Sequence, residues 1–198
     1  NTIYYMDDPV RYQIEEGYRH FLAFFSDNNS CLRRSIWEKH PYPDVDFSED
    51  QIWAKRMIEW GYKKVYCPTA AVYHSHNYPL KTYFKRYYDE YKAIYEIHRY
   101  QMYTSVKGML HGMFYLIGRD FKYIWNPKNH ISHKLKQMHY AWVRNRYKSI
   151  AGYIGGSYHG FPEPVKEYFD RKISQQHDQI HGEDGDTVKM DNKKAFWK

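Results

Sequence analysis

The first part of the chain alternates short apolar runs with polar, turn-forming clusters, and its clearest element begins near Ser48. Ser48 followed by Gln51 fits the capping box that starts many helices. Apolar residues then recur at helical spacing: Trp53, Ala54, Met57, Ile58 and Trp60. Gly61 lies where a left-handed C-terminal cap belongs. The pattern predicts a helix from Glu49 to Trp60.

Two short strands are expected after this helix. Residues 62–66 are β-prone and alternating, Pro68 interrupts the pattern, and residues 70–74 form a second apolar run that ends in histidine. Upstream, the polar cluster of residues 26–30 predicts a turn. Helix, strand, turn and strand in this order indicate an α/β arrangement.

From Pro79 onward the pattern becomes helical. Apolar residues recur at steps of three and four, as in an amphipathic helix: Leu80, Phe84, Tyr87, Tyr91, Ile94 and Tyr95. Further helices are predicted over residues 106–117 and 134–153, with a loop near Pro127 between them. Residues 171–198 are polar and show no apolar period, so we expect a mobile tail.

Composition changes the picture of the core. Leu, Ile, Val and Phe total only 38 of the 198 residues, but the chain has 23 Tyr, 10 Phe and 6 Trp. Aromatic side chains bury about 150–250 Å² each, so a core built on rings is expected, and a disordered chain is not. No apolar run approaches the roughly 18 residues that a bilayer crossing needs.

Cysteine usage and the first residues bear on the cellular setting. Cys31 and Cys67 show no CxxC spacing, and no charged-then-apolar leader opens the sequence. These features favour a reducing, cytoplasmic setting.

Two pairs of adjacent acidic residues are candidates for a functional role. Glu49 and Asp50 would open the predicted helix, where the helix dipole and backbone N–H groups keep a carboxylate ionised, as a general base requires. Acidic residues are also common in the first turn of ordinary helices, so a structural role stays open. Asp7 and Asp8 precede a proline, which predicts a helix start and not a metal-binding pair.

A histidine pair closes the second predicted strand. His74 and His76 would point to the same face of an extended chain, about 6–7 Å apart, so both could approach one metal or one phosphate. No third ligand is evident in the sequence, and a surface pair is an equally good interpretation.

Charge is concentrated in the helical stretch. Residues 79–150 carry 14 Lys and Arg against four acidic residues, interleaved with rings. Such a stretch can bind single-stranded nucleic acid, lie on an anionic membrane, or form a core. We favour the membrane surface because an apolar face with few expected partners runs through it: Met109, Leu110, Met113, Phe114, Leu116, Ile117, Phe121, Ile124 and Trp125.

Two segments together carry a resemblance to a known family. They read FFSDNNSCLRRSIWEKHPYPD at residues 24–44 and FSEDQIWAKRMIEWGYKKVYCPTAAVYHSHNY at residues 47–78. They resemble the C-terminal half of a family 2 glycosyltransferase catalytic domain. The continuation through residue 90 is most similar to bacterial rhamnosyltransferases of cell-surface polysaccharide synthesis. The resemblance implies a partial GT-A fold of α/β type, followed by an α-helical region.

The resemblance also implies roles for particular residues. Asp50 would take the proton of the acceptor hydroxyl during an inverting transfer, and Glu49 would position it. His74, with His76 as second choice, would bind a Mg²⁺ or Mn²⁺ ion on the leaving diphosphate. Residues near the acceptor sugar would be Asn28, Asn29 and Trp53. The expected partners are a nucleotide-sugar donor, a glycan or lipid-linked acceptor and an anionic membrane surface.

One departure from the family pattern concerns the donor side. The nucleotide-binding half, with its Asp-x-Asp motif, should lie well upstream of residue 20, so we expect it elsewhere in the same protein or in a partner. The chain alone is then expected to bind nucleotide sugar poorly. We divide it into an acceptor-side half (1–78), a basic helical region (79–170) and a tail (171–198), located peripherally on the inner face of the cell membrane. The alternative is a noncatalytic basic module for nucleic acid or an acidic polymer.

Overall fold

The protein is described by a computed structural model that covers residues 1–45, 48–74 and 78–172. Within these residues the chain forms eight α-helices, two single-turn 3-10 helices and two three-residue strands. The expected α/β GT-A arrangement is therefore wrong for the described part of the chain. Its sheet consists of β1 (Thr2–Tyr4) and β2 (Lys64–Tyr66) alone, paired antiparallel with Ile3 opposite Val65.

The second predicted strand is absent for a physical reason. Residues 70–74 have no partner strand among the described residues, and all of them are exposed, including Tyr73. An apolar run cannot form a strand unless another segment satisfies its backbone hydrogen bonds. The first predicted strand, in contrast, forms as β2 because β1 comes to it from the other end of this half of the chain.

The N-terminal part is a small helical cluster around α4. It contains α1 (Pro9–Ile14), α2 (Glu16–Ala23), the 3-10 helix η1 (Asp27–Asn29), α3 (Arg34–Lys39) and α4 (Glu49–Glu59). One side of α4 packs on α1 and α2 through Ile58, Tyr12 and Leu22. The other side of α4 carries Trp53, Ala54 and Met57, which pack against partly buried residues on both sides of α4 in the sequence: Phe25, Leu32, Ile36, Tyr42 and Tyr62. As predicted, Asp8 caps α1, and its carboxylate accepts from the Arg11 N–H at 2.9 Å.

The two ends of α4 differ in how well the sequence predicted them. Gly61 has φ +81°, its N–H donates to the Ile58 carbonyl at 3.1 Å, and the Tyr62 N–H donates to the Met57 carbonyl at 2.9 Å. This is the predicted left-handed glycine cap, in its Schellman form. The predicted capping box is wrong: Ser48 is itself left-handed, with φ 60°, and its side chain makes no capping hydrogen bond.

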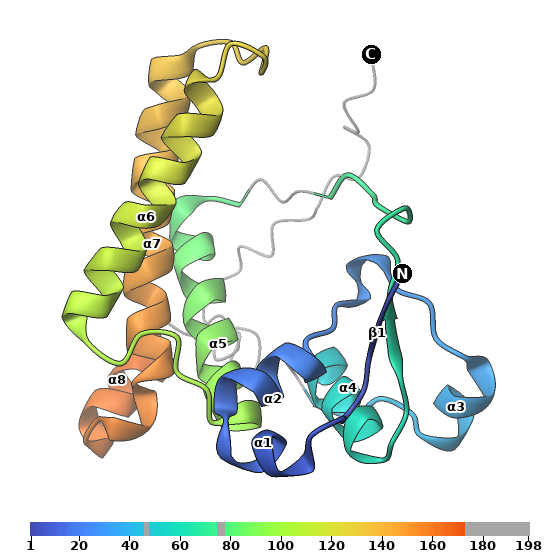
Figure 1. The fold of residues 1–198 in the computed structure, drawn as a ribbon. Helices are drawn as coiled ribbons and strands as arrows, with labels where there is room; N and C mark the ends of the chain where they lie inside the picture. Colours follow the sequence, from blue (N-terminus) through green and yellow to red (C-terminus); the bar gives the residue numbers. More distant parts are fainter. Residues whose placement is uncertain (46–47, 75–77, 173–198) are drawn as a thin grey trace.

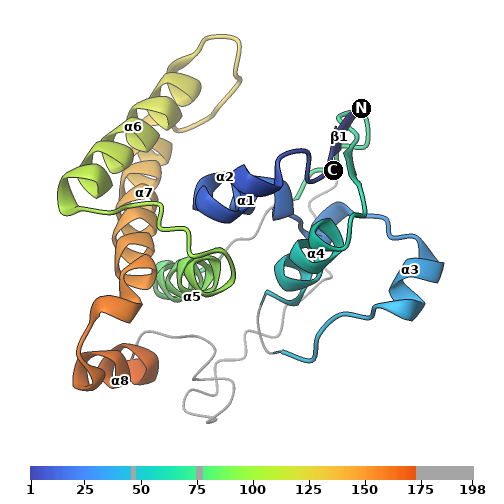
Figure 2. The same cartoon turned by 60° about the horizontal axis from the view of Figure 1, so that its bottom comes forward.

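The C-terminal part is a bundle of long helices. α5 (Leu80–His98), α6 (Val106–Trp125) and α7 (Lys134–Gly156) fall where the sequence predicted helices, and α6 is longer than expected. Figure 1 shows α5 between the N-terminal cluster and the α6–α7 pair, and Figure 2 shows the same order. After a second 3-10 helix, η2 (Tyr158–Gly160), the short α8 (Glu163–Lys172) ends the described residues.

Rings packed on small side chains make this bundle. Tyr88 and Tyr91 of α5 are buried, and Gly152 and Gly155 of α7 lie directly against them. Most buried residues of α7 are small: Ala141, Ser149, Ala151, Gly152, Gly155 and Gly156. Small side chains let the helix axes approach and leave room for large rings. Of the described helices, none is long and apolar enough to cross a bilayer.

Candidate functional site

The site predicted at the start of α4 is held by a contact from a distant part of the chain. Glu49 and Asp50 are the first two residues of α4. Because Ser48 does not cap the helix, the neighbouring turn is anchored differently: the side-chain amide of Gln51 donates to the backbone carbonyl of Phe25. This contact places the carboxylates of α4 beside η1.

Asp50 is half-buried and receives two backbone hydrogen bonds. Its Oδ1 accepts from the Gln51 N–H at 2.7 Å, and its Oδ2 accepts from the Asp27 N–H at 3.4 Å. Burial raises the pKa of Asp50 above its usual value, and the charges of Glu49 and Asp27 act in the same direction. The two N–H donors oppose this rise because they stabilise the ionised form. A carboxylate with a raised pKa is a stronger proton acceptor.

Asp27 forms a second carboxylate centre beside Asp50. Its Oδ1 accepts from the Tyr42 hydroxyl at 2.6 Å and from the Ser30 hydroxyl at 3.4 Å. Burial, followed by the hydrogen bond to Asp27, raises the pKa of Tyr42, so its phenol stays protonated and remains a donor. The Asp27 carboxylate therefore lies close to Asp50, and the hydrogen bond from Tyr42 fixes its orientation.

Trp53 packs against the residues that surround Asp27 and Asp50. Its ring is buried, packs against Tyr42 with centroids 5.5 Å apart, and also contacts Phe25. Its indole N–H donates to the His40 carbonyl at 2.6 Å. In this position Trp53 supports the residues around Asp27, and its contact with an acceptor sugar stays a prediction.

The two predicted amide residues lie on η1. Asn28 and Asn29 are both exposed, and the Asn28 backbone N–H donates to the Ser26 hydroxyl at 3.4 Å. The Asn29 side-chain amide donates to the Ala70 carbonyl, which ties η1 to the segment leading to His74. Asn28, next to Asp27 on the surface, is the better placed of the two to meet a polar ligand.

Of the two predicted metal ligands, the structure describes only His74. His74 is exposed, and His76 lies outside the described residues. Among the residues that the structure describes, no three His, Cys, Asp or Glu side chains come together in a way that could hold a metal ion. These residues do not by themselves fit a divalent cation, and the predicted Mg²⁺ or Mn²⁺ stays a prediction.

Sequence reasoning missed three residues of this arrangement. Asp27, Tyr42 and Gln51 all contact or orient the carboxylates, and none was predicted as a site residue; Gln51 was assigned to the capping box. Asp27 lies in the predicted polar turn, which was a usable signal. Nothing local to Tyr42 indicated that its hydroxyl would reach a residue 15 positions away.

The arrangement as a whole has the features of a site that activates a hydroxyl group. A half-buried, basic carboxylate beside exposed amide side chains can accept a proton from a polar, oxygen-rich ligand.

The comparisons with known proteins are partial. Over 69 residues, 34% of this chain, it is 41% identical to the O-antigen chain rhamnosyltransferase RfbN of Salmonella typhimurium. It is 43% identical over 69 residues to the O-antigen chain rhamnosyltransferase WbaN of Salmonella anatum. The matched part spans only 22% of each relative, about a fifth of its length. No family profile and no solved structure matches the chain significantly. Part of the chain is thus related to bacterial rhamnosyltransferases.

Proposed function

We propose that this chain carries the acceptor-side part of an inverting glycosyltransferase of family 2, one that transfers rhamnose from a nucleoside-diphosphate sugar to a glycan or lipid-linked acceptor. The observation that carries the proposal is the half-buried Asp50, whose pKa is raised at the start of α4. The partial similarity to two O-antigen chain rhamnosyltransferases supports the substrate class.

The proposed chemistry is a single displacement. An acceptor hydroxyl donates a hydrogen bond to Asp50, which takes the proton as the oxygen attacks the anomeric carbon. The new carbon–oxygen bond forms on the face opposite the nucleoside diphosphate, which leaves with the electron pair of the bond that breaks. The anomeric configuration is therefore inverted.

The neighbouring residues support this step in different ways. Glu49 and Asp27 raise the proton affinity of Asp50 by their charges. Asn28 would hydrogen-bond other hydroxyl groups of the acceptor, since its exposed amide offers both a donor and an acceptor. We assign the acceptor side to residues 1–78 and leave donor binding to parts of the protein outside this chain.

The test is a rhamnosyl-transfer assay on the protein in its full natural length. Asp50→Asn keeps the size and loses the base, so we expect the turnover number to fall by about 10²–10⁴-fold, with donor binding unchanged. Asp44→Asn, an exposed carboxylate outside the site, is the matched control and should retain activity. Undiminished turnover in Asp50→Asn would contradict the proposal.

A further inference from the structure

The end of the α6–α7 hairpin projects away from the rest of the protein. We call the residues from 121 to 140 the hairpin tip; they comprise the last turn of α6, the connecting loop and the first turns of α7. In Figures 1 and 2 this end extends beyond α5 and lies far from the N-terminal cluster.

The hairpin tip carries positive charge without acidic residues to balance it. No Asp or Glu lies between Asp120 and Glu163, a stretch that contains seven Lys and Arg. Asp120 itself is engaged inside the hairpin, since it accepts from Arg119 at 2.9 Å and from the buried Asn145 amide at 2.8 Å. Four lysines belong to the tip: Lys122, Lys128, Lys134 and Lys136.

Large apolar side chains are exposed among these lysines. Tyr123, Trp125 and Leu135 are 63%, 61% and 76% exposed. A shallow hollow lies between the two helices here, lined by Trp125, His133, Lys134, Leu135 and Lys136. The Lys134 ammonium lies 5.7 Å from the Trp125 ring centroid. Exposed rings and aliphatic groups surrounded by lysines are typical of surfaces that meet a lipid headgroup layer.

The structure buries part of the apolar face that the sequence assigned to the membrane and leaves another part exposed. The apolar residues that the sequence assigned to a membrane-facing side of α6 include Met109, Met113, Ile117 and Ile124, and these four are buried in the bundle. Of the same set, Leu110, Phe114 and Trp125 stay exposed, and Trp125, the last residue of α6, belongs to the hairpin tip.

We propose that the hairpin tip docks this protein on an anionic bilayer surface. Trp125, Tyr123 and Leu135 enter the headgroup region, and the four lysines contact lipid phosphates. Trp and Tyr prefer the membrane–water interface, and each lysine near an anionic surface strengthens binding by about fivefold. The inference does not depend on the catalytic assignment of Asp50.

The features of the tip favour a bilayer over a nucleic acid. Single-stranded nucleic acids bind grooves in which successive rings stack on bases. The tip instead is the projecting end of a hairpin, and its most exposed apolar side chain, Leu135, is aliphatic. An aliphatic side chain does not stack on a nucleobase as a ring does, whereas its transfer from water into the lipid layer is favourable.

The test is flotation of the full chain with vesicles of phosphatidylcholine, with and without phosphatidylglycerol. We expect binding to the anionic vesicles that weakens with salt. Trp125→Ala combined with Leu135→Ala should weaken it at least tenfold, and replacing the four tip lysines by Gln should abolish it. The control pair is Val10→Ala with Ile14→Ala, because both residues are 68% exposed on α1, away from the tip.

Three results would overturn the proposal. They are a lack of binding to anionic vesicles, an equal loss in the control pair, and binding of labelled single-stranded RNA by a chain that ignores vesicles. The substituted side chains are exposed except for Lys134, which is partly buried, and an unchanged circular dichroism spectrum verifies that each variant is folded.

Discussion

Asp50, the proposed base, lowers the stability of the folded protein when it is ionised. Its folded-state pKa lies above its ordinary value, so the folded protein binds this proton more readily than the unfolded chain does. The contribution of Asp50 to stability is therefore favourable at low pH and is lost as the pH rises through this raised pKa. A group that destabilises the folded state in its ionised form is common at functional sites, where selection acts on reactivity.

The charge of Asp27 provides a prediction at this scale. Asp27→Asn removes a negative charge that raises the pKa of Asp50 but keeps the backbone N–H that donates to it. The pKa of Asp50 should fall, and the acidic limb of the pH profile of kcat/KM should move to lower pH. Steady-state transfer rates across a pH series measure the shift.

The control for Asp27→Asn is Ser30→Ala, which removes a hydrogen bond to Asp27 without changing its charge. This variant should leave the acidic limb of the kcat/KM profile at the same pH. If that limb does not move in Asp27→Asn, or moves to higher pH, the charge of Asp27 does not raise the pKa of Asp50.

At the scale of elements, α5 and α7 meet more closely than ordinary side chains allow. A Cβ added at Gly155 would lie 2.3 Å from the Tyr88 carbonyl oxygen, which belongs to rigid helix backbone. One added at Gly152 would lie 3.0 Å from the Tyr91 ring. The glycines of α7 therefore determine the distance between the two helices.

Gly155→Ala should force α5 and α7 apart and lower the free energy of unfolding by about 1–3 kcal/mol. Gly118→Ala in α6 is the matched control, since nothing lies within 4 Å of its added Cβ. There the gain in helix propensity should stabilise the protein by up to about 1 kcal/mol. Urea denaturation followed by circular dichroism measures the free energy of unfolding of both variants. An equal effect of the two substitutions would contradict the close approach of α5 and α7 at Gly155.

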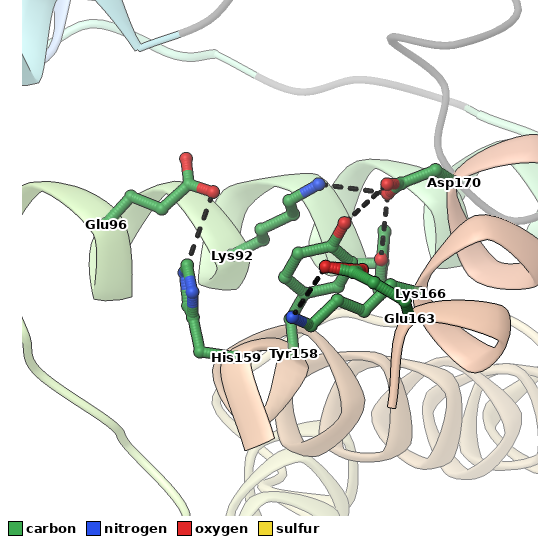
Figure 3. Close-up of polar contacts among 8 residues, drawn as sticks. Lys92, Glu96, Tyr158, His159, Glu163, Lys166 and Asp170 are labelled. Atoms are coloured by element: carbon green, nitrogen blue, oxygen red, sulfur yellow. Dashed lines mark hydrogen bonds and ion pairs between the residues drawn. The ribbon is translucent and has the colours of Figure 1, made fainter. Parts of the chain in front are cut away.

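A second link between elements attaches α8 to α5 and η2. Three donors meet at the Asp170 carboxylate: the Lys92 ammonium at 2.9 Å and the hydroxyls of Tyr88 and Tyr158 at 3.3 and 2.5 Å. Figure 3 shows Lys92 and Tyr158 directed toward Asp170. The Lys92 ammonium also lies 3.8 Å from the Tyr158 ring centroid. Tyr88 is fully buried, so its hydroxyl depends on this carboxylate.

Asp170→Asn keeps the shape but presents a neutral amide to three donors, and we expect a loss of about 1–3 kcal/mol in the free energy of unfolding. Glu163→Gln breaks a more exposed ion pair of α8, with Lys166 at 3.4 Å, and should change stability by less than about 1 kcal/mol. Thermal unfolding of the two variants compares them. Equal losses would mean that the Asp170 cluster does not hold α8.

At the scale of the molecule, a histidine pair joins the N-terminal cluster to the bundle. His20 of α2 and His98 of α5 face each other with ring centroids 5.2 Å apart, and His98 is fully buried. Burial lowers the pKa of His98 to about 3, and His20, Lys55 and Arg19 add repulsion to its protonated form. Burial also lowers the pKa of His20, helped by the charge of Lys64.

These histidines predict acid sensitivity of the whole fold. Below about pH 6.5, His98 takes up a proton in the unfolded chain but not in the folded one, so stability falls as the pH drops from there toward 3. At pH 5 this one residue accounts for about 2 kcal/mol. Melting temperatures between pH 7 and 5 measure the effect.

His98→Phe should flatten this pH dependence because it removes the titrating group from the interface. His111→Phe, at an exposed position on α6, is the control and should leave it as in the natural protein. If His98→Phe keeps the full slope, the acid sensitivity has another origin.

Local chemistry explains what sequence reasoning predicted correctly. The helices α4, α5, α6 and α7, the proline start of α1 and the Gly61 cap depend on residues within one or two turns of each other. Their side-chain spacing and backbone preferences are present in the sequence itself. The candidate site was predicted in the same way only as far as the start of α4, where Glu49 and Asp50 do lie.

Contacts between distant residues decided the remainder. Whether an apolar run becomes a strand depends on a partner, which β2 finds in β1 and residues 70–74 lack. Gln51 bonds to Phe25 instead of closing a capping box, and Asp27 reaches Asp50 across 23 positions. The sequence by itself thus determined where the helices lie and which carboxylate is the candidate base. Only the tertiary structure decided how that carboxylate is tuned, because burial and neighbouring charge depend on segments brought together by the complete fold.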